Sequence, residues 1–200
     1  RALTEDQTSA LGTLKQFAGD CTDVTLISTR GGNELKRTFL EAYIRPGLDP
    51  HNWTSRANYA ARGILQTGPE ELSIYVQHNY GYPTSHIRRY TLRPDGFASV
   101  HAPFAGGEMV TKPLRFSGDR LTINFSTSAA GSVRVELQDA AGQPLPGFAL
   151  DDCPEIIGDQ IDRTVAWKNG PDLGSLADKP IRLRFVLKDA DVFAFRFLRH

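Results

Sequence analysis

The stretch "IRLRFVLKDA" at residues 181–190 alternates apolar and charged side chains with a period of two. Its apolar residues share one face and its arginines the other: Ile181, Leu183, Phe185 and Leu187 against Arg182 and Arg184. Successive side chains of a β-strand point to opposite faces of a sheet. The stretch therefore predicts a strand with one face on a hydrophobic core and the other in solvent.

The same alternation recurs through the second half of the chain. It is found in the segments 107–118, 120–128, 132–140, 163–168 and 192–198. Turns rich in glycine and proline, such as "AAGQPLPG" (140–147), separate these segments. Several short alternating strands with such turns are typical of an antiparallel β-sandwich of jelly-roll or immunoglobulin-like type. We expect this domain to span residues 103–200.

The first half has a different organisation. β-rich runs at 23–29, 37–44, 58–66, 71–78 and 85–93 are spaced by glycine turns, and 27–35 and 91–99 resemble each other as a partial repeat. This spacing suggests blades of a β-propeller. A capping box at residues 4–7, followed by apolar residues at helical spacing, predicts one short N-terminal helix. We therefore expect residues 1–102 to hold propeller blades and this helix.

Composition excludes several classes of function. Hydrophobic residues make up 40% of the chain, which is enough for a folded core. Lys+Arg and Asp+Glu both number 23, so no basic excess favours nucleic acid or an anionic membrane as a partner. No apolar run is long enough to span a membrane. No nucleotide-binding or zinc-binding motif is present, and we expect no cofactor.

A resemblance adds to this interpretation. The runs "FLEAYIRPGLDPHNWTSRANYAARGILQTGPEELSIYV", "RRYTLRPDGFASVHAPFAGGEMVTKPLRF" and "GSVRVELQDAAGQPLPGF" are similar to bacterial glycosidase-like proteins resembling glycosyl hydrolase family 32. That family joins a five-bladed β-propeller to a C-terminal β-sandwich. The resemblance implies a carbohydrate partner, a secreted or periplasmic location, and a chain that is the C-terminal fragment of a longer protein. The family's catalytic motifs do not occur here, so the resemblance places the catalytic carboxylates upstream.

Two functions of different class follow. In the first, the chain is the C-terminal portion of a glycoside hydrolase-like protein, and the sandwich supports the catalytic propeller. In the second, it is a non-catalytic carbohydrate-binding or scaffold protein.

The loop "RPGLDPHNWTSR" at residues 45–56 carries an unusual tryptophan. Trp53 is a candidate platform for a sugar ring, and Arg56 and Asn58 are candidate hydrogen-bond donors to its hydroxyl groups. In the alternative, Trp53 is a packing residue and Arg45 forms a local salt bridge with Asp49.

A second cluster, "QHNYGYPTSH" at residues 77–86, supplies His78, Tyr80 and His86 as candidates for the other side of a sugar-binding rim. The alternative is an amphipathic hairpin loop. Glu41 lies between apolar neighbours and is a candidate catalytic acid. In the alternative it points to solvent.

The acidic segment "DDCPEIIGDQID" (151–162) places Asp151, Asp152 and Glu155 close together. Clustered carboxylates are candidate calcium ligands, but the spacing does not match an EF-hand. We therefore expect no metal site, and a solvated acidic loop partly balanced by Arg163 and Lys168.

Overall fold

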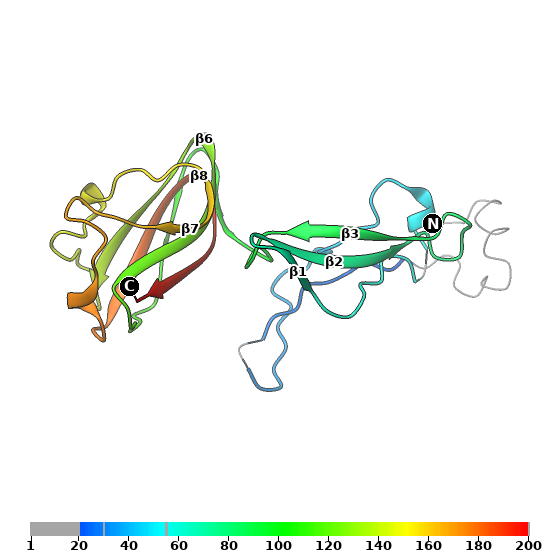
Figure 1. Ribbon diagram of the computed structural model, residues 1–200, viewed down its shortest axis with the longest axis horizontal. Helices are drawn as coiled ribbons and strands as arrows, with labels where there is room; N and C mark the ends of the chain where they lie inside the picture. The colour runs from blue at the N-terminus through cyan, green and yellow to red at the C-terminus, as the bar shows by residue number, and fades with distance from the viewer. Residues whose placement is uncertain (1–20, 30, 55, 200) are drawn as a thin grey trace. The chain divides into compact units, whose positions relative to one another are not determined.

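The computed structural model describes residues 21–29, 31–54 and 56–199 (Figure 1). In this part of the chain all regular structure is strand or short 3₁₀ helix, so the prediction of a mainly-β fold is confirmed. The helix expected over residues 4–18 lies outside the described residues. The chain divides into two compact units, Arg1–Leu92 and Arg93–His200. No described helix has the length and apolar character needed to cross a membrane.

The second unit is built on a five-stranded antiparallel sheet dominated by two long strands, β6 (Arg120–Asp139) and β8 (Ile181–Leu198). β8 pairs with β6 on one side and with two short strands on the other, and β7 pairs with the far side of β6. The short strands are β4 (Val100–Ala102), β5 (Gly107–Val110) and β7 (Asp159–Thr164). Two 3₁₀ helices, η3 (Leu150–Asp152) and η4 (Gly174–Leu176), lie in the connections.

Each long strand joins two segments that the sequence pattern predicts as separate strands. The pairing of β6 with β8 shifts register between Asn124 and Phe125 and again between Thr127 and Ser132. Such bulges bend a strand and increase its twist without ending it. As a result the sheet curls into a half-barrel, and Figure 1 shows both long strands strongly bent.

The core of the second unit lies on one face of this sheet. The alternating apolar residues of β6 face those of β8 across the ladder, and the pattern seen in the sequence is confirmed. All of them are essentially inaccessible to solvent: Val133, Val135, Leu137, Leu183, Phe185 and Leu187. Burial of several large side chains of this kind, at about 25 cal/mol per Å² of apolar surface, stabilises the curled sheet.

The first unit contains a three-stranded antiparallel sheet in the order β1–β2–β3. Its strands are β1 (Leu65–Gly68), β2 (Glu71–His78) and β3 (His86–Leu92), and η2 (Pro50–Asn52) lies in the preceding loop. The predicted strand at 71–78 forms β2, which lies in the middle of the sheet. Among the described residues of this unit, Ile44, Ile74 and Val76 form a small buried apolar cluster.

The expectation of strands at 23–29 and 37–44 is wrong. These segments run beside each other but form only isolated bridges, Val24 with Ile44 and Ser28 with Lys36. Most side chains between the two bridges are exposed. With little apolar surface to bury, the pair lacks the packing that sustains a hairpin ladder.

Candidate functional site

The second unit holds an open pocket of about 380 Å³ beside strand β6. Its lining comes from β6, from the acidic segment around η3 and from the turn after β7. The lining residues are Arg134, Asp151, Asp152, Cys153, Pro154, Glu155, Trp167 and Lys168. The candidate metal ligands of the acidic segment thus lie on a pocket together with two cationic side chains.

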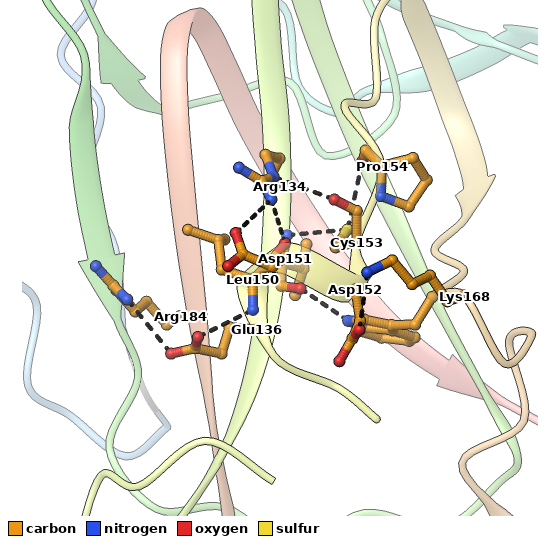
Figure 2. Close-up of polar contacts among 11 residues, drawn as sticks. Arg134, Glu136, Leu150, Asp151, Asp152, Cys153, Pro154, Lys168 and Arg184 are labelled. Carbon is orange, nitrogen blue, oxygen red and sulfur yellow. Dashed lines mark hydrogen bonds and ion pairs between the residues drawn. The ribbon is translucent and has the colours of Figure 1, made fainter. Parts of the chain in front are cut away.

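Arg134 organises one wall of this pocket (Figure 2). It stands on the polar face of β6, and its Nε donates to the carbonyl oxygen of Cys153 at 3.1 Å. Its terminal nitrogen donates to the carbonyl oxygen of Leu150 and lies 3.4 Å from the Asp151 carboxylate. One guanidinium group therefore ties η3 to the sheet, as its rigid fork of donors favours.

The floor is apolar and closely packed. Trp167 is 3% exposed, donates its indole N–H to the Val135 carbonyl oxygen at 2.9 Å, and meets Phe148 edge to face. The Cys153 sulfur accepts the Val135 N–H at 3.3 Å. Burial raises the pKa of the Cys153 thiol, although the Val135 hydrogen bond and Arg134 act in the opposite direction. A neutral, buried thiol suits a packing role.

The rim carries the charges. Lys168 Nζ lies 3.4 Å from the Asp152 carboxylate, and the Lys168 N–H donates to the Asp152 carbonyl oxygen at 2.8 Å. The Asp151 side chain is 96% exposed, and Glu155 is exposed as well. Among residues 21–29, 31–54 and 56–199, no group of three or more His, Cys, Asp or Glu side chains is placed to hold a metal ion.

Glu136 does not line the pocket, but it binds the first residue of η3, and the other two residues of η3 do line it. Its carboxylate accepts the Leu150 N–H at 3.0 Å and the Gln138 amide at 2.8 Å, and lies 3.4 Å from Arg184 (Figure 2). Burial pushes the pKa of Glu136 upward, but the hydrogen bonds from Gln138, Leu150 and Arg184 outweigh it and hold the pKa below its ordinary value. The anchored start of η3 fixes the loop that forms the rim.

In the first unit, the loop with Trp53 folds around buried amides. Asn52 donates to the Pro46 carbonyl oxygen at 2.9 Å and to the Asn58 side chain, while Asn58 also donates to the Thr22 carbonyl oxygen. Asn52 and Asn58 are both fully buried. The candidate Asn58 therefore has its hydrogen-bonding groups engaged within the loop.

Trp53 lies on the outside of this loop. It is 42% exposed, and its indole N–H donates to the Gly47 carbonyl oxygen at 2.9 Å. Arg45 pairs with the exposed carboxylate of Glu41, four residues earlier in the chain, instead of with Asp49. The candidate acid Glu41 thus lies in solvent beside an arginine.

The other candidates form two pairs. Arg56 and Tyr80 lie together, with the guanidinium 3.4 Å from the phenol oxygen and 5.9 Å from the ring centre. His78 and His86 stack with ring centres 5.5 Å apart. His78 is buried, and its Nε2 is 2.9 Å from the Tyr90 hydroxyl, whereas His86 is exposed.

Sequence reasoning missed Arg134 and Trp167 as site residues. Arg134 appears in the sequence only as a polar position of an alternating strand, and Trp167 lies near the end of a short predicted strand. The partners of Arg134 come from a loop 16 to 19 residues further along the chain. Only the folded chain brings them together.

Comparison with known proteins gives no further assignment: no family model, no curated protein and no solved structure matches this chain.

Proposed function

We propose that this chain is the C-terminal, β-rich portion of a glycosidase-like carbohydrate-active protein, and that its own role is to bind carbohydrate without hydrolysing it. The observation that carries the proposal is the pocket beside β6. There the carboxylates of Asp152 and Glu155 and the ammonium group of Lys168 share a rim over a rigid apolar floor. Alternating charged acceptors and donors of this kind suit the vicinal hydroxyl groups of a sugar.

The state of Glu136 favours binding over hydrolysis. A glycosidase requires one carboxyl group that stays protonated, with a raised pKa, to protonate the leaving group. Glu136 is the buried carboxyl group next to the pocket, and its hydrogen bonds lower its pKa instead. The exposed rim carboxylates are suited to accept hydrogen bonds from hydroxyl groups.

We propose that the first unit derives from propeller blades and the second from a jelly-roll-like sandwich, with the protein secreted or periplasmic. The antiparallel sheets are compatible with both assignments. Trp53, which is exposed on the loop that leads to Arg56, is proposed as a second sugar contact on the first unit.

The test is calorimetric titration of the chain with a panel of oligosaccharides. Each hydrogen bond to a charged group contributes about 1.5–3 kcal/mol, so loss of one weakens binding about tenfold or more. We expect this loss in Glu155→Gln and in Lys168→Met. Both side chains are exposed, so neither change should disturb folding.

Two matched controls are available. Lys179→Met removes an exposed lysine that does not line the pocket, and Glu70→Gln does the same for an exposed acid. Both should bind like the wild type. Oligosaccharide binding that survives both rim variants unchanged would rule out the pocket as the binding site. If Trp53→Ala lost oligosaccharide binding in that case, the binding site would lie in the first unit.

A further inference from the structure

The buried imidazole of His78 lies where the polar loop (residues 46–54 and 56–58) attaches to the β2–β3 hairpin. Gln77, the residue before His78, binds the end of this loop through two backbone hydrogen bonds. The Asn58 N–H donates to the Gln77 carbonyl oxygen at 2.7 Å, and the Gln77 N–H donates to the Tyr59 carbonyl oxygen at 2.9 Å. The residue after His78, Asn79, donates its N–H to Asn52 Oδ1 at 3.1 Å. His78 is therefore flanked on both sides by the hydrogen bonds that hold the loop.

Three aromatic groups pack at this point. His78 is 4% exposed, stacks on His86 across the strand pair, and stacks on Tyr90 with ring centres 5.7 Å apart. Its Nε2 meets the Tyr90 hydroxyl at 2.9 Å. The Nε2 of a neutral imidazole can accept a hydrogen bond from that hydroxyl group, so the arrangement needs no charge at His78.

A proton on His78 would meet mostly unfavourable neighbours. From β3, His86 and Arg88 present positive or protonatable groups, while the loop contributes one carboxylate, Asp49. Asp49 is already engaged by the His51 N–H at 3.0 Å and the Asn79 amide at 3.0 Å, and His51 Nδ1 lies 3.4 Å from it. Desolvation adds to the repulsion, because a buried charge costs more than an exposed one.

Two features of Asn79 weaken the attachment of the polar loop to the hairpin. Asn79 is in the left-handed backbone region with φ +53°, and its side-chain oxygen is buried without a hydrogen-bond partner among the described residues. Both features cost free energy. A segment whose attachment carries such costs opens locally at a lower free energy than that of global unfolding.

We propose that His78 is a pH-sensitive latch, and that its protonation in mildly acidic solution releases the polar loop, with Trp53 and Arg56, from the β2–β3 hairpin. The latch does not depend on carbohydrate binding by either unit.

Proton binding by His78 is coupled to opening of the loop, and the lowered pKa fixes the direction of the pH effect. Burial lowers the pKa of His78, Arg88 and His86 lower it further, and Asp49 acts against them. The opened state then takes up the proton more readily than the closed state. The closed state is fully favoured above the ordinary histidine pKa of about 6.5 and loses this advantage as the pH falls from there toward the lowered value.

The test combines NMR titration of the imidazoles with hydrogen exchange at the Asn79 amide, from about pH 8 to about pH 5. In the wild type we expect His78 to titrate below about 6.5. Protection of the Asn79 amide, corrected for intrinsic exchange, should fall as the pH drops below about 6.5. The total fall should be roughly tenfold for each pH unit by which the pKa of His78 in the closed state lies below that value. A His78 titration at or above the ordinary value would overturn the proposal without any variant.

Variants separate the latch from general acid destabilisation. His78→Gln keeps a partner for Tyr90 but does not titrate in this range, so protection of the Asn79 amide should become independent of pH. His86→Gln, which removes the exposed imidazole of the stacked pair, should keep the pH dependence. If His78→Gln does not fold, Tyr90→Phe keeps the imidazole and should keep the pH dependence with a displaced midpoint. Unchanged pH dependence in a folded His78→Gln protein, or its disappearance in His86→Gln alone, would contradict the latch.

Discussion

At the scale of single residues, charged side chains of β6 hold a loop of the second unit to the sheet. Arg134 ties η3 to β6 through the carbonyl oxygens of Leu150 and Cys153, and Glu136 receives the first N–H of η3. Both stand on β6, at polar positions that alternate with the apolar residues Val133, Val135 and Leu137. A buried charge that is fully hydrogen-bonded specifies one loop geometry, since any other geometry leaves it unpaired.

Glu136→Gln provides a test at this scale. The variant keeps the shape of the side chain but loses the charge that faces Arg184 and the Leu150 N–H, so we expect the free energy of unfolding to fall by about 1–3 kcal/mol at neutral pH. The lowered pKa of Glu136 means that its contribution is present above the ordinary carboxyl pKa and is lost as the pH falls through the lowered value.

Urea unfolding between neutral and acid pH measures this effect. The difference between wild type and Glu136→Gln should shrink on acidification, because protonation removes the same charge from the wild type. Glu155→Gln, at an exposed position, serves as the control and should leave the unfolding curve unchanged at every pH. A constant difference across the pH range would show that the charge of Glu136 does not stabilise the fold.

At the scale of elements, the bend of β6 depends on one glycine. A Cβ added at Gly131 would lie 2.4 Å from the Asp189 carbonyl oxygen and 2.6 Å from that of Lys188. Both atoms belong to the backbone of β8 and cannot move like a side chain. The close approach of the two strands beside the bulge therefore requires a residue without a Cβ.

Gly131→Ala should accordingly destabilise the second unit by about 1–3 kcal/mol through overpacking and displacement of the strand backbone. Gly68→Ala is the control, because its added Cβ would make an ordinary contact at 3.5 Å from Glu71. Chemical denaturation of both variants checks the difference. Equal stability of Gly131→Ala and wild type would mean that the ladder adjusts freely at the bulge.

At the scale of the whole molecule, the described residues of the two units form separate apolar clusters, and the cluster of the second unit is much the larger. Each unit also contains one of the two tryptophans: Trp53 is exposed in the first, and Trp167 is buried in the second. Intrinsic fluorescence can therefore follow each unit separately, and a Trp53→Phe background reports the second unit alone.

In that background, Phe185→Ala should lower the free energy of unfolding reported by Trp167 by about 3–5 kcal/mol, because Phe185 is fully buried in the larger core. In the presence of Trp53, the signal of the first unit should keep its wild-type midpoint. A shift of both signals by the same amount would indicate that the two units unfold as a single cooperative body.

The sequence by itself determined the mainly-β fold, the alternating apolar face of 181–187 and the bounds of β2, because side-chain alternation is a local property of the strand backbone. It also pointed to the acidic segment 151–155, since clustered carboxylates are visible without a structure. Only the tertiary structure decided that two pairs of predicted strands join into β6 and β8, that 23–29 and 37–44 form bridges instead of strands, and that Arg134 and Trp167 meet the acidic segment. These outcomes depend on register, bulges and contacts between residues distant in the chain, and such long-range packing leaves no local pattern in the sequence.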